Sequence, residues 1–313
     1  MAFAQGVVRE VLMSLLSFPV IAGTTLAVLI GVSLGLLGGG GSILTVPILV
    51  YVIGVPAHEA IALSLLVVGT TSLAALIPHA RAQRVQWKTG ALFGATSMVG
   101  AFGAGKLAHF IPATALLLLF GGMMLITAVA MMRGKASAED PPHVAERKLS
   151  ELPILKIVLE GLAVGAVTGL VGAGGGFLVV PALVLLGKLP MRIAVGTSLL
   201  VIAMKSFAGF AGYISSVSVD WPLAAVVTLA AVLGSFGGGA LAGRVPQALL
   251  RRGFAWFVVV MAVFILFQEI PRALGAPIDL ATAWPLVLGA SAVPAVLAAI
   301  DLVRRSRAAP ASS

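Results

Sequence analysis

The chain has 313 residues, of which 60% are hydrophobic and only 10% are charged, and its mean hydropathy is +1.12. No soluble domain has enough interior to bury that much apolar surface, so the composition predicts a membrane protein with several spans. The absence of cysteine excludes disulfides, thiolate metal sites and cysteine nucleophiles. The net charge of +9 lies mostly in short connections and the C-terminal tail, which indicates membrane orientation and not a nucleic-acid-binding surface.

Nine apolar segments are each long enough to cross the roughly 30 Å of hydrocarbon in a bilayer as a helix, which takes about 20 residues. Two shorter apolar stretches, 43–53 and 177–186, each follow a glycine-rich run and are predicted to be half-helices or re-entrant segments. The expected fold is therefore all-α, a polytopic membrane protein with glycine-broken pieces. The nine predicted spans are 11–37, 58–79, 89–109, 113–132, 153–171, 192–213, 222–243, 249–268 and 280–302.

One half of the chain repeats the other at a constant spacing of 134 residues. Pro47 and Pro181 share this spacing, and so do Trp87 and Trp221, within an ungapped match that also aligns several glycines. Shared low complexity in Gly- and Leu-rich helices would not align prolines and tryptophans, so the match favours a duplication. The predicted organisation is a first transmembrane repeat (11–132), a cytoplasmic linker (133–152), a second transmembrane repeat (153–268) and an additional C-terminal transmembrane helix (280–302).

The loop charges predict that the two repeats are inverted relative to each other. The connection that follows the second predicted span is basic, with Arg81, Arg84 and Lys88, whereas its counterpart in the second repeat carries only Asp220. Because Lys and Arg are enriched on the cytoplasmic side of membranes, charges that alternate between repeats indicate opposite orientations. Opposite orientation requires an odd number of crossings per repeat, so each short post-glycine stretch is expected to cross. The linker and the C-terminus are then expected in the cytoplasm.

Two glycine-rich runs, 38–42 and 172–176, interrupt the apolar sequence at corresponding positions of the two halves. Such a run opens the helix backbone, exposes N–H groups and starts a short helix whose N-terminal dipole favours an anion. Paired breaks of this kind indicate the binding site of a transporter; the alternative is that the glycines only allow close helix packing. The predicted anion-binding residues are Gly38, Gly39, Gly40, Gly41 and Ser42 in the first run, and Gly172, Gly174, Gly175 and Gly176 in the second.

Lys205 is the only Lys or Arg deep within a predicted span. A charge at that depth is expensive, so it is expected to face a cavity and a partner, and no Asp or Glu lies comparably deep in another span. A transported anion would be such a partner, or the lysine would lose its proton when the site is empty. The alternative is a lysine that extends to the membrane interface. The repeat places Thr71 at the equivalent position of the first half.

Hydroxyl side chains follow both breaks on the next helix of each half. They can hydrogen-bond an oxyanion, or they can bond to carbonyl groups of their own helix. The hydroxyls predicted to contact substrate are Thr71, Ser72, Thr197, Ser198 and Ser206.

The sequence lacks the motifs of P-loop nucleotide-binding proteins and of zinc proteases. The chain contains no GxxxxGK[ST] and no HExxH pattern, and its four histidines do not cluster as metal ligands would. We therefore predict no catalytic residues, no metal and no cofactor.

Residues 35–42 (GLLGGGGS) and 169–176 (GLVGAGGG), each leading into a Val-Pro pair, resemble the TauE/SafE sulfite exporter family. Residues 194–199 (AVGTSL) and 206–210 (SFAGF) resemble it too, and the likeness covers about 15–268. The resemblance implies a small permease of the bacterial inner membrane that handles sulfite, sulfonates such as sulfoacetate, and related organosulfur anions.

Together these features predict a secondary transporter that exports small sulfur-containing anions. The alternative is a passive anion channel, whose flux should not saturate at low substrate or depend on a coupling ion. The expected partners are the organosulfur anion and the lipid bilayer, with a proton or sodium as the coupling ion to test and a homo-oligomer compatible with the sequence. No nucleic acid is expected.

Overall fold

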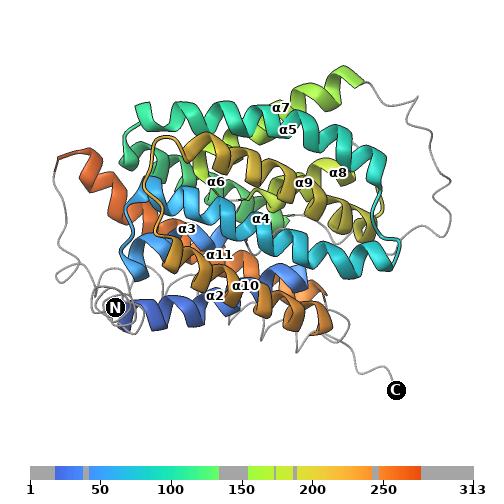
Figure 1. The fold of residues 1–313 in the computed structure, drawn as a ribbon, viewed down its shortest axis with the longest axis horizontal. Helices are drawn as coiled ribbons and strands as arrows, with labels where there is room; N and C mark the ends of the chain where they lie inside the picture. Colours follow the sequence, from blue (N-terminus) through green and yellow to red (C-terminus); the bar gives the residue numbers. More distant parts are fainter. Residues whose placement is uncertain are drawn as a thin grey trace, which may run out of the picture. The chain divides into compact units, whose positions relative to one another are not determined.

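The computed structural model describes residues 18–37, 42–133, 154–172, 174–185, 189–241 and 247–275 (Figure 1). Every element of regular structure in these ranges is a helix. In chain order the helices are α2 (Phe18–Leu37), α3 (Thr45–Pro47), the π-helix η2 (Ile48–Ile53), α4 (Ala57–Arg81), α5 (Trp87–Leu107), the short 3₁₀ turn η3 (Ala108–Phe110), α6 (Ala113–Arg133), α7 (Ile154–Val171), α8 (Gly176–Leu185), α9 (Met191–Tyr213), α10 (Trp221–Leu241) and α11 (Gln247–Ala273).

The structure has helices at eight of the nine predicted spans and at both short post-glycine segments. The first short segment is irregular, passing from α3 into η2 and ending at Gly54, whose left-handed φ of 85° only glycine adopts without strain. The second is the ten-residue helix α8. The largest difference in bounds is at α11, which begins two residues before the predicted 249–268 and ends at Ala273. The predicted span 280–302, residues 11–17 and nearly all of the linker lie outside the described residues.

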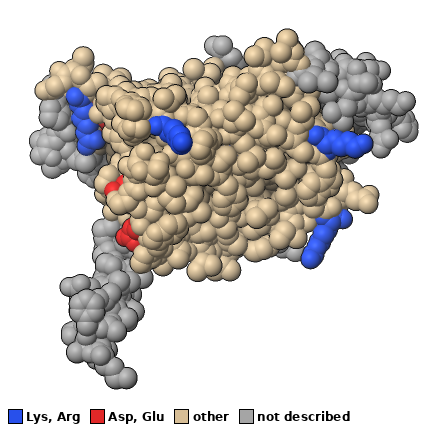
Figure 2. All heavy atoms as spheres, turned by 45° about the horizontal axis from the view of Figure 1, so that its top comes forward, with Lys and Arg blue, Asp and Glu red and all other residues tan. Residues whose placement is uncertain are grey.

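The described helices form a multi-pass membrane protein. Three of them, Ala57–Arg81, Ile193–Tyr213 and Trp221–Gly239, are long and apolar enough to cross a membrane by length and composition, and shorter apolar helices accompany them. Large apolar side chains point outward from the middle of helices, as Val99 (66% exposed) and Leu233 (70% exposed) do. Figure 2 shows a face of the molecule over most of which no charged side chain lies. An uncharged outer surface of this extent is expected where helices meet lipid.

The chain divides into two compact units, each of which takes elements from both predicted repeats. The first unit comprises 1–112 and 137–246 and so contains α2–α5 and α7–α10. The second comprises 113–136 and 247–313, where α6 packs on α11. Neither half of the sequence is therefore compact by itself, and the division into repeat domains stays a prediction.

Within the first unit, glycines bring α2 against α10 and α5 against α7 at backbone distance. A Cβ atom on Gly31 of α2 would collide with the carbonyl of Ala231 on α10, and one on Gly165 of α7 with the carbonyl of Ser97 on α5. These two contacts correspond through the 134-residue spacing, with the two halves exchanged. Small residues that let backbones approach are the usual means of packing helices in lipid. Packing therefore accounts for the repeated glycines that lie before the breaks.

Helices α4 and α9, which occupy equivalent places in the repeat, pack antiparallel to each other. Gly69 of α4 meets the ring of Phe207, and Leu65, one turn earlier, lies by Gly209, further along α9. Both helices begin after a proline in nearly the same conformation: Pro56 has φ −53° and ψ 142°, and Pro190 has φ −54° and ψ 143°. Proline lacks the N–H that a helix start leaves unpaired and so favours these starts.

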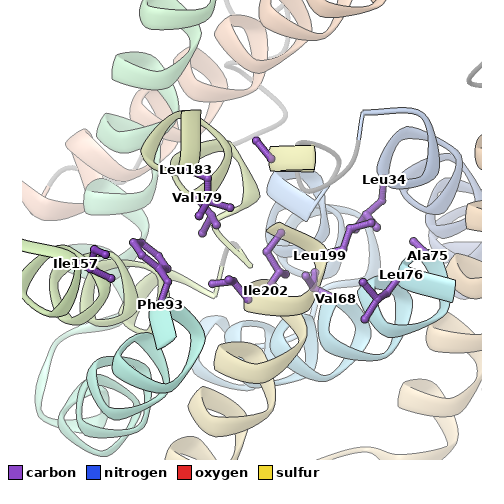
Figure 3. Close-up of a cluster of buried hydrophobic side chains, with 12 residues drawn as sticks. Leu34, Val68, Ala75, Leu76, Phe93, Ile157, Val179, Leu183, Leu199 and Ile202 are labelled. Carbon is purple, nitrogen blue, oxygen red and sulfur yellow. The ribbon is translucent and has the colours of Figure 1, made fainter. Parts of the chain in front are cut away.

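An apolar core surrounds α8 and joins it to both halves of the first unit. Val179 and Leu183 of α8 lie in one buried cluster with Ile202 of α9, Phe93 of α5 and Val68 of α4 (Figure 3). The short helix is thus held by side-chain packing, and the position of the break before it is set by that packing.

We expect two glycine substitutions on α10 to separate the effect of close helix packing from the effect of helix propensity. Gly234→Ala places a Cβ against the carbonyl of Val28 on α2, whereas Gly237 has open space at that position. Overpacking typically costs about 1–3 kcal/mol, while Gly→Ala in an unobstructed helix favours the fold by up to about 1 kcal/mol. Gly234→Ala should therefore lower the midpoint of thermal unfolding in detergent, and Gly237→Ala should leave it unchanged or raise it. Equal midpoints for the two variants would contradict the packing of α2 on α10.

Candidate functional site

The second glycine run breaks the chain between α7 and α8. Gly172, Gly174 and Gly175 have φ values of 72°, 57° and 62°, a left-handed conformation that residues with a side chain rarely adopt. The N–H of Gly172 still donates to Thr168 of α7 (3.0 Å), and the carbonyl of Gly175 accepts from Val179, which begins the hydrogen bonding of α8. The run is thus a sharp turn that directs the N-terminal end of α8 toward the break, as the sequence predicts.

Lys205 of α9 is buried directly against this turn. Its side chain is 1% exposed, and its Nζ donates a hydrogen bond of 2.7 Å to Thr168 Oγ1. A Cβ atom on Gly175 would collide with that Nζ and with the side chain of Thr168. Thr168 Oγ1 in turn donates to the carbonyl of Val164 (2.6 Å). The ammonium group therefore lies at the break, and the alternative of a lysine extending to the membrane interface is wrong.

Thr168 is the one hydrogen-bond partner of Lys205 in the part of the chain that the structure describes, and no carboxylate there pairs with it. An ammonium group has three N–H donors, so two remain for a further acceptor. A buried charge without compensation is strongly unfavourable in a medium of low polarity. The arrangement therefore fits a small anion beside the turn, at the two remaining donors.

Ser42, at the start of the first short segment, also lies at the turn between α7 and α8. Ser42 is fully buried, and a Cβ atom on Gly174 would lie 3.1 Å from Ser42 Oγ and collide with Val68 of α4. Ser64 of α4 donates to the carbonyls of Gly172 (2.5 Å) and Ile61 (2.8 Å). Residues of the first half thus contact the second break. Gly38, Gly39, Gly40 and Gly41 lie outside the described residues, and Gly176, which begins α8, is buried.

The predicted hydroxyl residues fall into two groups. Three of them bond to the backbone: Thr71 donates to Val67 (2.6 Å), Ser198 donates to Val195 (2.7 Å), and Thr197 accepts from the N–H of Gln86 (2.9 Å). Ser72 and Ser206 are fully buried, and their hydroxyl groups have no hydrogen-bond partner among the residues that the structure describes. Unsatisfied buried hydroxyls are uncommon, so these two are the better candidates for contact with a ligand.

The antiparallel register of α4 and α9 places the equivalent residues Thr71 and Lys205 at the same level. Leu65 lies by Gly209, and Gly69 by Phe207, so continuing along both helices brings residue 71 to the level of 203–205. At this level the lysine is present on α9, and α4 carries a threonine instead.

Sequence analysis missed Thr168, the partner of Lys205. Its signal was a hydroxyl one helical turn before Gly172 in the otherwise apolar stretch 161–171. The repeat did not reveal it, because the equivalent residue of the first half is Leu34. Tyr213 was also missed; its hydroxyl donates to the carbonyl of Leu170 (2.7 Å) and ties the end of α9 to the last turn before the break.

The chain is similar to known membrane transporters over most of its length. Residues 24–265 match the model of a family described as sulfite exporter TauE/SafE. A Xylella fastidiosa (strain 9a5c) protein named "Probable membrane transporter protein" is 35% identical over 77% of this chain and 92% of its own length. A similarly named protein of Bacillus subtilis (strain 168) is 29% identical, with coverages of 76% and 97%, and one of Methanocaldococcus jannaschii is 27% identical, with 77% and 94%. No solved structure matches significantly.

We expect Lys205 and Thr168 to be coupled in stability. Thr168→Val leaves the lysine buried without its hydrogen bond, which should cost about 1–3 kcal/mol. With Lys205→Met, which removes the charge at similar size, the same Thr168→Val change should cost far less. The four proteins form a double-mutant cycle that is measured by thermal unfolding without added anion. Additive changes in the unfolding midpoint would contradict a direct interaction.

Proposed function

Because the chain belongs to the TauE/SafE sulfite exporter family of membrane transporters, we propose that it is a secondary transporter that exports small sulfur-containing anions. Sulfite, sulfoacetate and other sulfonates are the substrates that we propose, and the bacterial inner membrane is the location. The protein is a transporter and not an enzyme, so its chemistry is limited to binding and release.

The observation that carries the proposal is the buried Lys205 next to the α7–α8 turn, two of whose N–H donors have no partner in the described part of the chain. A sulfite or sulfonate group has three oxygen acceptors and would supply the missing counter-charge. Such an anion would accept from Lys205 and from N–H groups at the start of α8. Ser42, Ser72 and Ser206 are the further donors that we propose in this shell, together with the remaining glycines of both runs.

We further propose that the two repeats are inverted. The antiparallel packing of α4 and α9 supports this, because equivalent helices run antiparallel when a pseudo-two-fold axis lies across them. The exchange of contacts between α2–α10 and α5–α7 supports it too. With the basic loop of Arg81 and Arg84 in the cytoplasm, the C-terminus would also be cytoplasmic.

Alternating access would then arise from movement of one broken segment and its neighbouring helices against those of the other repeat. A transporter of this kind shows saturable flux that depends on a coupling ion, a proton or sodium. Flux through reconstituted protein that neither saturates nor responds to either ion gradient would point to the alternative, a passive anion channel. Assembly into a homo-oligomer is compatible with this scheme.

We expect sulfur oxyanions to stabilise the purified protein through Lys205. A ligand that binds only the native state at 100 times its dissociation constant stabilises by about 2.7 kcal/mol, which raises the unfolding midpoint. Sulfoacetate or sulfite should do so for the wild type, and chloride should not. Lys205→Met should abolish the response, whereas Lys88→Met, at an exposed lysine, should retain it.

Two results would contradict this proposal in different ways. If no sulfur oxyanion shifts the midpoint of the wild type, the substrate class is wrong. If the shift persists in Lys205→Met, the anion binds elsewhere, and the lysine has a structural role.

A further inference from the structure

We propose that Ser97 is a further substrate-binding residue, which together with Lys205 and Thr168 forms one anion site per chain, on a single side of the pseudo-two-fold axis. This inference rests on the proposed function and deepens it. Neither the sequence motifs nor the repeat singles out Ser97.

Ser97 of α5 is a buried serine. It is fully buried, and its Oγ makes no hydrogen bond to any residue within the described ranges of the chain. The preceding residue, Thr96, is on the same helix and donates to the carbonyls of Phe93 (3.0 Å) and Leu92 (3.3 Å). The helix therefore offers carbonyl acceptors at this point, and Ser97 does not use them. A buried serine hydroxyl without a hydrogen-bond partner is best explained by a ligand that binds and dissociates.

Ser97 lies where α5 faces both α7 and α9. A Cβ on Gly165 of α7 would collide with the carbonyl of Ser97, so the two backbones touch. On the α9 side, Gly94 meets Met204, and Ala101 lies by Gly209, so the level of Ser97 falls between residues 204 and 209. Lys205 lies within this interval.

The same glycine connects Ser97 to the lysine's partner. Thr168 Oγ1 lies 3.3 Å from the carbonyl of Gly165, the residue whose backbone touches Ser97. The backbone of Ser97 thus touches α7 at Gly165, one helical turn before Thr168. An oxyanion at the free donors of Lys205 could accept a further hydrogen bond from Ser97, which would provide donors from three helices.

The equivalent positions on the opposite side of the pseudo-two-fold axis lack the lysine and the two hydroxyl groups of this site. Through the 134-residue spacing, the equivalents of Lys205, Thr168 and Ser97 are Thr71, Leu34 and Ala231, all fully buried. The hydroxyl of Thr71 donates to the carbonyl of Val67, and the other two residues are apolar. The repeat therefore duplicates the helices but not this set of three polar side chains. A second, symmetry-related anion would have no lysine as counter-charge and no hydroxyl in the places of Thr168 and Ser97, so we expect one anion per chain.

The test compares Ser97→Ala with the mirrored control Ala231→Ser, using sulfoacetate and sulfite as probes. Without anion, Ser97→Ala should keep or raise the unfolding midpoint, because it removes an unsatisfied polar group. Its dissociation constant for the anion should rise roughly tenfold, as expected for one hydrogen bond to a charged group. Ala231→Ser should leave the dissociation constant unchanged. Isothermal titration of the wild type should give one anion per chain.

The outcomes separate this inference from the proposed function. A wild type that binds neither probe overturns both. A wild type that binds, with Ser97→Ala binding equally well, overturns only the role of Ser97. A lower midpoint of Ser97→Ala without anion would assign the serine to packing, and two anions per chain would overturn the one-sided site.

Discussion

The structure depends on how an ammonium group is accommodated in a dry interior. Lys205 donates a hydrogen bond to Thr168, its one partner among the described residues, and its Nζ lies against a glycine turn that has no room for a side chain. Burial of such a charge is unfavourable unless a counter-charge is supplied. A protein that needed the lysine only for stability would be better served by an apolar residue of similar volume. We therefore regard the unpaired donors as the basis of anion recognition.

Helix packing through glycine makes this arrangement geometrically possible. Backbone contact of α2 with α10, and of α5 with α7, ties each half of the sequence to the other. The second break then meets Ser42 and Ser64 from the first half, and the equivalent helices α4 and α9 lie side by side. A site built from both halves is sensitive to any movement of one half against the other, which is the property that alternating access requires.

The parts that the sequence predicts well follow from polarity and periodicity. The long apolar segments predicted the helices, and the glycine run at 172–176 predicted the break between α7 and α8. A backbone that is opened within hydrocarbon must be buried in protein or line a cavity, so few other structures fit this sequence. Lys205 stood out because charge in a span is rare. Thr168 and Ser97 did not, because a single hydroxyl in an apolar helix usually bonds to its own backbone, as Thr71 does. Only tertiary contacts show that Thr168 also accepts from Lys205 and that Ser97 is buried between helices. The 134-residue repeat did not reveal either residue, since their equivalents are apolar.

The most direct test of the account is to locate the bound anion. Selenite has the shape and charge of sulfite and contains an anomalous scatterer, so crystals of the protein grown with it can be measured at the selenium edge. We predict one anomalous peak per chain, within hydrogen-bond distance of Lys205 Nζ and beside the turn at Gly174 and Gly175. A peak remote from the lysine, or two peaks related by the pseudo-two-fold axis, would contradict the account.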